Sequence, residues 1–477
     1  MTLRPYPAYK ESGLPWLGRV PKHWDLLRAK YLMREMDIRA KDESGTLLSV
    51  SQYSGVTKRR PREGSEDPDT RSSSLFGYKV AKPGNLVSNI MLAWNGSLGI
   101  APMEGLVSPA YCVYRICIGE PWFFHHLLRS PAYKAEIKRR SRGVVDSRLR
   151  LYTDDFFRIP MLLPNLREQQ AIVRFVRDLD EKVHRFIRNR RRLIEVLNEQ
   201  KQAIINRAVT RGLDPDAPFK SSGIDWLGDI PGHWMRVPLK HVARVQTGIT
   251  LGKNYRSQRL EERPYLRVAN VQVGQVDLRQ VKTVMVPPSE IPGSELRFGD
   301  VLMTEGGDID KLGRGCVWKN EIEGCLHQNH IFAVRVSQDR IIPEYLVALM
   351  ASRHGRIYFE ITAKRTTNLA STNSTTLGAF PLILPSIDEQ RRILTNIEFE
   401  TAELEALLTK AAREIDLIRE YRTRLISDVV TGKVDVRHLA PAPGSQDLEE
   451  TVASLEPLED DIADGVIDDE EPFNEPE

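Results

Sequence analysis

Residues 12–24 read SGLPWLGRVPKHW, and residues 222–234 read SGIDWLGDIPGHW. Eight of these thirteen positions are identical at an offset of 210 residues. Two tryptophans, a glycine, a proline and a histidine at fixed spacing do not form a catalytic constellation. The repeated phrase (residues 12–24 and 222–234) instead indicates one structural part that is present twice, so the chain is predicted to consist of two similar halves.

A second repeat follows at an offset of 221 residues, where IPMLLPNLREQQAIV (159–173) matches FPLILPSIDEQRRIL (380–394). Both segments run from apolar residues through a proline to Glu-Gln and into a long helical pattern. Ser386 and Glu389 have the spacing of a capping box, in which the serine side chain and the glutamate carboxylate accept each other's backbone amide hydrogens. Asn165 and Glu168 form the analogous start of the first helix.

The two helical patterns share one heptad register and the same ending. A period of 3.5 residues is typical of a coiled-coil seam. The patterns end in AVTRGLD (208–214) and VVTGKVD (429–435), where glycine supplies a left-handed cap. About 45 residues at 1.5 Å per residue give each helix a length of about 67 Å. The predicted register positions are Ile172, Val176, Leu179, Val183, Phe186, Arg190, Leu193, Leu197, Gln200 and Ile204, and then Ile393, Ile397, Glu400, Leu404, Leu407, Ala411, Glu414, Ile418, Tyr421 and Leu425.

The globular segments between these repeats are alike in outline. Each has a strand-like run after a glycine turn, a later β run, and then a helical stretch (122–140 and 344–361), which is typical of an α+β domain built mainly of antiparallel strands. The predicted fold class is α+β, with two globular domains joined by two long antiparallel coiled-coil helices in a pseudo-two-fold internal repeat. The predicted boundaries are 1–164 for the first domain, 165–212 for the first helix, 213–385 for the second domain, 386–433 for the second helix, and 438–477 for an acidic tail that we expect to be disordered.

Composition is that of a soluble globular protein, with 41% hydrophobic and 28% charged residues. No apolar run approaches the roughly 18 residues of a membrane span, and the N-terminus MTLRPYPAYKESG lacks an apolar signal core. We therefore expect a cytoplasmic protein. The four cysteines (Cys112, Cys117, Cys316 and Cys325) show no CxxC spacing, which favours free thiols over a disulfide or a metal site.

The formal charge hides an asymmetry. Residues 438–477 contain fourteen acidic and no basic residues, so the +3 of the whole chain becomes +17 for residues 1–437. A strongly basic body suggests a polyanion as partner. Ribosomal, RNA and DNA binding all fit this charge, and so does a basic protein with no nucleic-acid role.

Basic residues concentrate in loops and flanks of both globular segments, as in KRRPREG (58–64), KRRSRGVVDSRLR (138–150), KNYRSQRLEERPYLR (253–267) and AKRTTNLASTNS (363–374). Phosphate contacts supply affinity for nucleic acid, whereas Arg, Lys, Asn and Gln at groove edges discriminate bases. The candidate DNA contacts are Lys58, Arg59, Arg139, Arg140, Arg148, Arg256, Arg314, Asn329, Lys364 and Arg365.

Motifs for independent chemistry are missing from the sequence. The segment TGITLGKN (247–254) comes closest to a P-loop, but its glycine spacing is short and Asn254 stands where Ser or Thr would bind magnesium. There is no dinucleotide-binding loop, no Asn/Asp-Pro-Pro-aromatic run of amino-methyltransferases, and no convincing metal-nuclease cluster. His23 and His233 each precede a tryptophan, and packing or hydrogen bonding is the expected role of both. We predict a non-catalytic chain that binds no cofactor or metal of its own.

The paired WLG-x-x-P-x-HW phrases, the paired LP-x-x-x-EQ helix starts and the paired VT…D helix ends resemble the specificity subunit of type I restriction–modification systems. Residues 82–111 and 298–318 also resemble target-recognition domains of that family, and the resemblance covers nearly the whole chain except the acidic tail. It implies a DNA reader in which each target-recognition domain reads one half of an asymmetric bipartite site and the helices fix the spacer. It implies double-stranded DNA, two methyltransferase (M) subunits and restriction/translocase (R) subunits as partners, with no membrane. S-adenosylmethionine, ATP and Mg would then be bound by the partner subunits.

By the same resemblance, the repeated phrase fastens each domain against the distal end of the other half's helix. The predicted junction residues are Trp16, Trp24, Glu168, Gln169, Trp226, Trp234, Glu389 and Gln390. Two alternatives stay open. A protein-binding coiled-coil scaffold without DNA readout predicts no salt-dependent DNA affinity, and a fused catalytic DNA-modifying enzyme predicts S-adenosylmethionine binding by the isolated chain.

Overall fold

The structure is a computed structural model of the whole chain. It describes residues 3–41, 45–59, 75–145, 148–253, 255, 259–307, 312–313, 315–365 and 370–440. The chain divides into two compact units: unit 1 comprises residues 1–191 and 413–477, and unit 2 comprises residues 192–412. Each unit therefore contains one globular domain and a stretch of each long helix.

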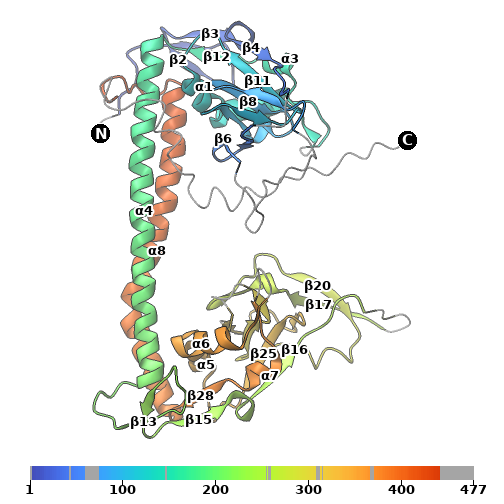
Figure 1. Cartoon of the computed structure of the whole chain (residues 1–477), viewed down its shortest axis with the longest axis vertical. Coiled ribbons are helices and arrows are strands. Elements are labelled where there is room, and N and C mark those ends of the chain that lie inside the picture. Colours follow the sequence, from blue (N-terminus) through green and yellow to red (C-terminus); the bar gives the residue numbers. More distant parts are fainter. Residues whose placement is uncertain are drawn as a thin grey trace. The chain divides into compact units, whose positions relative to one another are not determined.

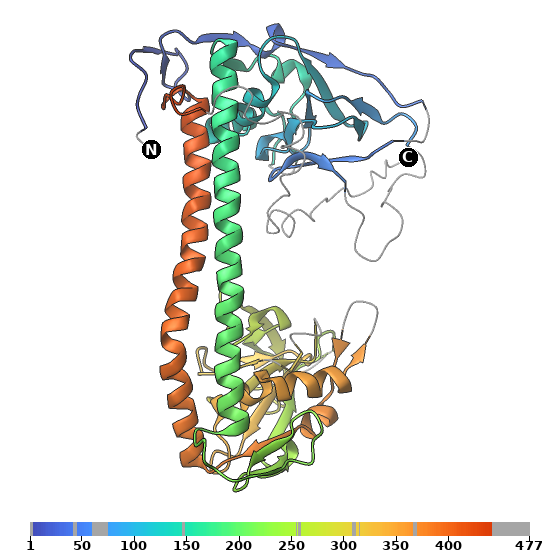
Figure 2. The same ribbon diagram turned by 60° about the vertical axis from the view of Figure 1, so that its left-hand side comes forward.

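The two long helices are α4 (Leu166–Arg211) and α8 (Ile387–Val430). Both have the predicted start, because the Glu168 amide donates to the Asn165 side chain over 3.0 Å and the Glu389 amide donates to the Ser386 hydroxyl over 3.3 Å. Both are followed by a glycine in the left-handed region, Gly212 at φ +73° and Gly432 at φ +78°. In each unit a stretch of α4 lies beside a stretch of α8, as Figures 1 and 2 show.

Ion pairs between the helices establish their direction. In unit 1, Asp180 Oδ1 lies 2.7 Å from Arg422 Nε, and Arg190 Nε lies 2.6 Å from Glu414 Oε2. In unit 2, Lys201 Nζ lies 2.8 Å from Glu405 Oε1. As the residue number rises in α4 the partner's number falls in α8, so the helices are antiparallel, as predicted.

The predicted heptad register is one residue early at four alternate positions of each helix, whereas Ile172 and Ile393 are fully buried as predicted. Ile187 is fully buried whereas Phe186 is partly exposed, and in α8 Ile415 is buried whereas Tyr421 is 49% exposed. The packed positions are 180, 187, 194 and 201 in α4 and 401, 408, 415 and 422 in α8, one residue after those predicted. Both helices shift alike, so the offset of 221 is retained. The prediction placed mainly apolar residues in the seam. The seam also includes the charged side chains of Asp180 and Arg422, because they pair with each other.

The first globular domain is built on an antiparallel sheet of order β4-β11-β8-β9. Two helices, α1 (Pro121–Leu128) and α2 (Pro131–Arg140), pack on this sheet. The core also includes side chains from the start of α4 and the end of α8. The strands are β1 (Tyr9–Glu11), β2 (Arg19–Pro21), β3 (Asp25–Arg28), β4 (Met33–Met36), β5 (Leu48–Ser51), β6 (Gly55–Lys58), β7 (Lys79–Ala81), β8 (Asn85–Asn89), β9 (Leu98–Ile100), β10 (Gly105–Val107), β11 (Tyr111–Ile116) and β12 (Pro160–Leu163), and the short helix α3 spans Thr153–Phe156.

The second globular domain repeats this plan. Its main sheet has the order β16-β25-β21-β23, with the helices α5 (Pro343–Ala351) and α6 (Arg353–Thr362) packed on it. A further sheet, β20-β17-β24, contains a parallel pair between β17 and β24. The strands are β13 (Phe219–Ser221), β14 (Asp229–Pro231), β15 (Met235–Pro238), β16 (Ala243–Thr247), β17 (Glu261–Leu266), β18 (Val271–Gln272), β19 (Gln275–Val276), β20 (Lys282–Val286), β21 (Val301–Thr304), β22 (Gly306–Gly307), β23 (Gly315–Val317), β24 (Leu326–His327), β25 (Ile331–Val336), β26 (Lys364–Arg365), β27 (Ala370–Ser371) and β28 (Pro381–Leu384), with the helix α7 at Ser374–Gly378.

Each predicted helical stretch consists of two helices. The stretch 122–140 divides between α1 and α2 because Pro131 lacks the amide hydrogen that would continue α1. The stretch 344–361 divides at Ser352, which has an extended backbone. All four cysteines are free thiols. The described tail residues Leu439 and Ala440 pack against the first domain's core, and residues 441–477 lie outside the described ranges.

Candidate nucleic-acid interface

The repeated phrase places a buried tryptophan against the start of a long helix. In the first domain, Trp24 Nε1 donates to Glu168 Oε1 over 3.0 Å, and His23 Nε2 lies 2.9 Å from Glu168 Oε2. Both tryptophans of this kind, Trp24 and Trp234, are fully buried. In the second domain, Trp234 and His233 make the same two contacts with Glu389, at 3.0 and 2.9 Å. Each glutamate therefore binds the phrase, and Glu168 Oε2 also accepts a hydrogen bond from the side chain of its capping residue, Asn165, over 3.4 Å.

The glutamine that follows each glutamate holds a different segment. Gln169 Nε2 donates to the Pro164 carbonyl over 2.7 Å, and Gln169 Oε1 accepts from the Glu120 amide just before α1, also over 2.7 Å. Gln390 makes the matching bonds, to the Pro385 carbonyl at 3.1 Å and from the Ile342 amide before α5 at 2.9 Å. The glutamate side chain thus binds the repeated phrase, and the glutamine side chain binds the backbone just before a helix of the globular domain.

The phrase also contacts the end of the other long helix. A Cβ on Gly432, just after α8, would lie 2.4 Å from Pro21 Cδ and 3.1 Å from Trp24 Cζ3. A Cβ on Gly212, just after α4, would lie 3.2 Å from Trp234 Cζ2. We call these two places the first junction (Trp24, Glu168, Gly432) and the second junction (Trp234, Glu389, Gly212). In both, the left-handed backbone and the close tryptophan ring require glycine.

The remaining predicted junction residues lie beside these sites. The Trp16 ring makes an edge-on contact with Tyr133, with ring centroids 5.1 Å apart. Trp226 Nε1 donates to His354 Nδ1 over 3.2 Å. The structure therefore places all four tryptophans of the two phrases in contacts within their own units.

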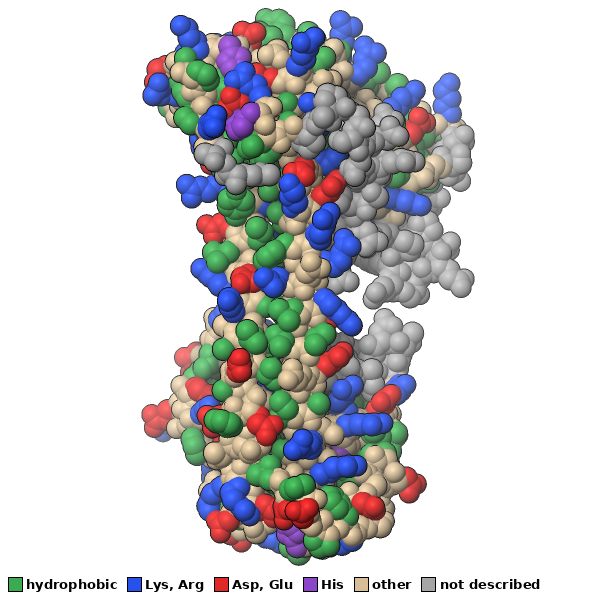
Figure 3. Space-filling view, turned by 90° about the vertical axis from the view of Figure 1, so that its left-hand side faces the viewer, with side chains coloured by type: hydrophobic (Ala, Val, Ile, Leu, Met, Phe, Trp, Pro, Cys, Tyr) green, Lys and Arg blue, Asp and Glu red, His purple; other side chains and the backbone are tan. Residues whose placement is uncertain are grey.

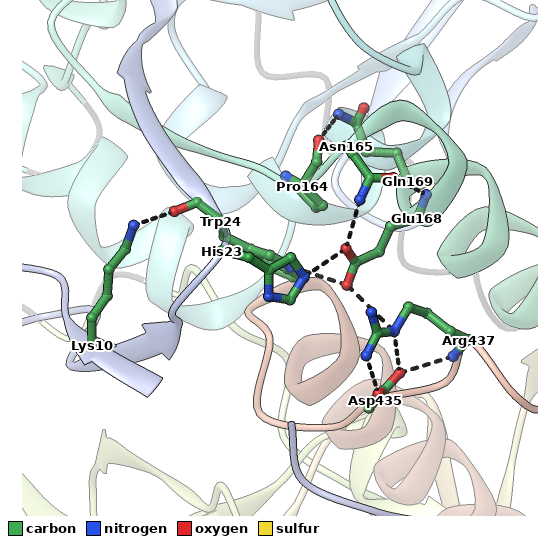
Figure 4. A network of polar contacts seen from close by, with 9 residues as sticks. All are labelled: Lys10, His23, Trp24, Pro164, Asn165, Glu168, Gln169, Asp435 and Arg437. Carbon is green, nitrogen blue, oxygen red and sulfur yellow. Dashed lines mark hydrogen bonds and ion pairs between the residues drawn. The ribbon is translucent and has the colours of Figure 1, made fainter. Parts of the chain in front are cut away.

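The first junction has additional charged groups. Figure 4 shows His23, Trp24 and Arg437 converging on Glu168, with Arg437 Nε 3.9 Å from Glu168 Oε1. Burial opposes ionisation of Asp435, but hydrogen bonds from Arg437 outweigh it and hold the pKa of Asp435 below its usual value. Burial, together with the Glu168 charge, raises the pKa of the Tyr6 hydroxyl well above its usual range. These are structural pairings that satisfy a carboxylate whose side chain is only 1% exposed.

The candidate DNA contacts of the first domain separate into two groups. Lys58 is exposed at the end of β6, Arg59 follows it, and Arg148 is exposed in the segment between α2 and α3. Arg139 and Arg140 both bind Glu136, whose side chain is 1% exposed; Arg139 Nε lies 2.7 Å from Glu136 Oε2. These two guanidinium groups are therefore held on the surface of α2 by a buried carboxylate.

The candidates of the second domain gather near one end of its main sheet. Asn329 lies just before β25, and Lys364 and Arg365 form the exposed strand β26. Arg365 Nη2 lies 3.4 Å from Glu360 Oε1. Arg256 and Arg314 lie outside the described residues.

A basic hairpin stands at the corresponding place in each domain. In the first, the described residues 142–145 and 148–150 are joined by paired backbone bonds between Arg142 and Arg150, both 2.9 Å, and the Leu151 amide then donates to the Ile90 carbonyl after β8. In the second, β26 (364–365) pairs with β27 (370–371), and the Thr372 amide donates to the Glu305 carbonyl after β21. The same architectural position thus carries cationic side chains twice, with different neighbours.

Four side chains at these two positions were not among the predicted DNA contacts: Arg142, Arg150, Glu305 and His330. The available signal was the register of the strands, since Glu305 directly follows β21 and His330 directly precedes β25. Among the described residues, no group of three or more His, Cys, Asp or Glu side chains is placed to hold a metal ion. None of the helices within the described ranges combines the length and hydrophobicity that a membrane span needs.

Comparisons with known proteins agree with the resemblance carried by the motifs. No protein-family model matches the chain. The chain is 24% identical over 460 residues to the type I restriction enzyme MjaVIII specificity subunit of Methanocaldococcus jannaschii, covering 90% of this chain and 98% of that protein. It is 22% identical over 207 residues to the putative type I restriction enzyme MjaX specificity subunit of the same organism, and here the match spans 47% of the relative's length and 43% of this chain.

One solved structure shows the fold. The chain matches a chain from a structure described as concerning complex assembly and conformational transition of the type I R-M system, with a TM-score of 0.56 and 18% identity. The match covers 86% of this chain and 98% of that chain. The predicted resemblance and fold class are thereby confirmed: the chain is similar in sequence to type I specificity subunits and has two domains joined by long helices.

Proposed function

We propose that this chain, a relative of type I restriction enzyme specificity subunits, is the DNA-reading subunit of a type I restriction–modification complex. Each target-recognition domain reads one half of an asymmetric bipartite site, and the paired helices fix the spacer between the half-sites. The observation that carries this proposal is the doubled hairpin, because the same sheet position presents basic residues in both domains while the neighbouring side chains differ. Two similar scaffolds with different reading residues are what an asymmetric site requires.

The chain itself is proposed to be non-catalytic. Two methyltransferase subunits, which bind S-adenosylmethionine, would modify the site, and restriction subunits with ATP and Mg would translocate and cleave DNA. Because a methyl acceptor in a stacked base pair is out of reach, the methyltransferase subunits would extrude the target adenine from the duplex. The role of this chain is then to deliver those subunits to one sequence.

Exposed apolar side chains on the helices support a protein partner there. In unit 1, Leu417 is 47% and Tyr421 is 49% exposed. In unit 2, Val196 is 43% and Phe399 is 82% exposed. Figure 3 shows hydrophobic side chains among charged ones on the outer surface of the helices. Large apolar side chains that face solvent favour a docked subunit, and we propose that the methyltransferase subunits cover them.

Selection from random DNA duplexes tests the proposed function. The complex of this chain with its methyltransferase subunits is incubated with a random-sequence duplex library, and the bound duplexes are sequenced. We expect one motif with two different half-sites separated by an unspecified spacer. A single contiguous motif, or retention without any motif, would contradict the proposal.

A paired heptad deletion tests the role of the helices. Removing residues 188–194 from α4 and 408–414 from α8 takes seven residues from each side of the antiparallel seam and leaves the heptad register intact. Seven residues span about 10 Å, which corresponds to about three base pairs at 3.4 Å each. We expect both half-sites to be unchanged and the spacer to become shorter by about three base pairs. An unchanged spacer would contradict the ruler role.

A further inference from the structure

Glu305 and His330 form a cross-strand pair at the end of the second domain's main sheet. Glu305 follows β21 and His330 precedes β25, and the Glu305 amide donates to the His330 carbonyl over 2.9 Å. Their side chains also meet, with His330 Nδ1 2.6 Å from Glu305 Oε2. Backbone and side chain are thus both fixed, while the His330 and Glu305 side chains remain 56% and 34% exposed.

Two glycines and a basic hairpin lie next to this pair. Gly306 and Gly307 form β22 directly after Glu305, and β22 pairs with β27. A Cβ on Gly306 would lie 3.3 Å from the Ala370 carbonyl of β27, whereas a Cβ on Gly307 would meet no described atom within 4 Å, so the backbone at Gly307 leaves room for another molecule. Beyond β27, β26 presents the exposed side chains of Lys364 and Arg365. The pair therefore lies beside a cationic hairpin suited to phosphate contacts.

A carboxylate on a surface that contacts DNA is unfavourable unless it accepts a hydrogen bond from the DNA. It repels phosphate oxygens, and it also repels the acceptor atoms that guanine, adenine and thymine present in the major groove. It gains only from a base that donates, and the 4-amino group of cytosine is the usual donor to Glu or Asp. A carboxylate can accept about four hydrogen bonds, and the contact with His330 uses one of these.

The corresponding positions of the first domain are chemically different. There the partner in the hairpin bond is Ile90, and Tyr111 pairs with Asn89 so that Ala110 stands opposite Ile90. Neither side chain donates or accepts a hydrogen bond. The two domains therefore cannot read this position in the same way.

We propose that Glu305 is a specificity-determining residue of the second target-recognition domain and accepts a hydrogen bond from the exocyclic amino group of a base, cytosine in the first instance. His330 is a positioning residue, since its ring holds the carboxylate at the end of β21. This inference rests on the proposed function, because it assigns one contact within the half-site that the second domain reads.

Single-base substitution of the selected site tests the inference. Binding of the complex is measured for the wild-type chain, Glu305→Gln and Glu305→Ala, on duplexes that carry every base pair at each position of both half-sites. We expect both variants to lose discrimination at one position of the second half-site by at least about fivefold, the lower end of what a base contact supplies. The first half-site and the spacer should be unchanged. Glu323→Gln is the matched control, because Glu323 is exposed and belongs to the turn between β23 and β24, at the other end of the sheet.

Removing the amino group from the base identifies the donor. At the affected position, 2-pyrimidinone replaces cytosine or purine replaces adenine. Wild type should lose affinity with only one of these analogues, which tells the two donors apart, and Glu305→Ala should be indifferent to it. For the positioning role, His330→Ala should relax the same position, and His330→Asn, which keeps a donor for the carboxylate, should restore most of the discrimination.

The possible failures are distinguishable. If wild type selects a bipartite site but the Glu305 variants keep full discrimination at every position, the inference is overturned and the proposed function stands. A uniform loss of affinity across all sequences would overturn it equally, because it would make Glu305 a structural residue. If wild type selects no bipartite site, the proposed function and this inference fall together.

Discussion

Trp24 Nε1 donates to Glu168 Oε1 over 3.0 Å, and 210 residues later Trp234 Nε1 donates to Glu389 Oε1 over the same distance. Each bond joins a globular domain to the first turn of a long helix, where a carboxylate also benefits from the helix dipole. The same tryptophan rings press on the glycine after the other helix. The repeated phrase therefore joins the start of one long helix to the end of the other. The phrase occurs twice because the chain has two such junctions.

Removing the carboxylate of the first junction should destabilise unit 1. Glu168→Ala leaves the buried indole N–H of Trp24 without its acceptor and removes contacts to His23 and Arg437. Since hydrogen bonds to charged groups contribute about 1.5–3 kcal/mol, we expect a loss of about 2 kcal/mol in the free energy of unfolding. Urea denaturation followed by tryptophan fluorescence measures it. The exposed Glu199→Ala on α4 should change stability by less than about 0.5 kcal/mol, and an equal effect of both variants would show that the Trp24–Glu168 bond does not stabilise unit 1.

Replacing both residues of the ion pair in the helix seam should be tolerated, whereas removing only one of them should destabilise the protein. Asp180 is 8% exposed and binds Arg422 through two bonds, of 2.7 and 3.1 Å. Asp180→Ala leaves the guanidinium without its carboxylate and should cost about 2–3 kcal/mol, whereas Asp180→Leu combined with Arg422→Leu should stay within about 1 kcal/mol of wild type. A double-mutant cycle of Asp180→Leu, Arg422→Leu and the double variant, measured by urea unfolding, gives the coupling. Asp178→Ala in the exposed pair with Lys182 is the control and should cost at most about 0.5 kcal/mol. A double variant as unstable as Asp180→Ala would refute this view of the seam.

Local sequence patterns predict part of the fold. Features that depend on which residues meet in the folded structure could not be predicted. Repeated sequence patterns predict the two halves, the helix starts at Asn165 and Ser386, and the glycines that end the helices. Each of these features depends only on residues that are close in the sequence. The residues that pack in the seam between the helices could not be predicted in this way. Phe186 is more hydrophobic than Asp180, and only the pairing of Asp180 with Arg422 explains why Asp180 lies in the seam. Glu305 and His330 were missed for the same reason, since 25 residues separate two side chains that the sheet brings to 2.6 Å.

His327 should make the second domain sensitive to acid. It is fully buried beside the Arg335–Asp300 ion pair, its Nδ1 lies 3.0 Å from the Ile331 carbonyl, and burial lowers its pKa to about 4 from 6.5. The unfolded chain binds a proton near pH 6.5 but the folded chain does not, so this contribution to stability is complete above pH 6.5 and is lost as the pH falls toward 4. At about 1.4 kcal/mol per pH unit, the loss reaches about 2 kcal/mol at pH 5.

Unfolding of wild type and His327→Gln at pH 7 and pH 5 measures this contribution. Glutamine keeps a donor for the carbonyl but does not titrate. We expect the stability advantage of wild type over the variant to shrink by about 2 kcal/mol between pH 7 and pH 5. Parallel pH dependences would show that His327 titrates alike in both states.

Lys364 should bind phosphate without reading sequence. It is exposed on β26, next to the candidate reading pair. Lys364→Ala in the complex should weaken binding to all duplexes alike and make the slope of log K against log salt less steep by about 0.9, as expected for one phosphate contact. Lys319→Ala, an exposed lysine after β23 at the other end of the sheet, should leave the slope unchanged. A change in base preference with Lys364→Ala would instead make it a base reader.

Adenine-methylation sequencing of the source genome, with and without this chain, tests most directly whether the chain directs a methyltransferase to one DNA sequence. We expect one bipartite motif with two unlike half-sites to be methylated when the chain is present and to lose all its methylation when the chain is deleted. Restoring the chain should restore the motif. If every methylated motif persists after the deletion while the partner methyltransferase is active, the chain is not its DNA reader.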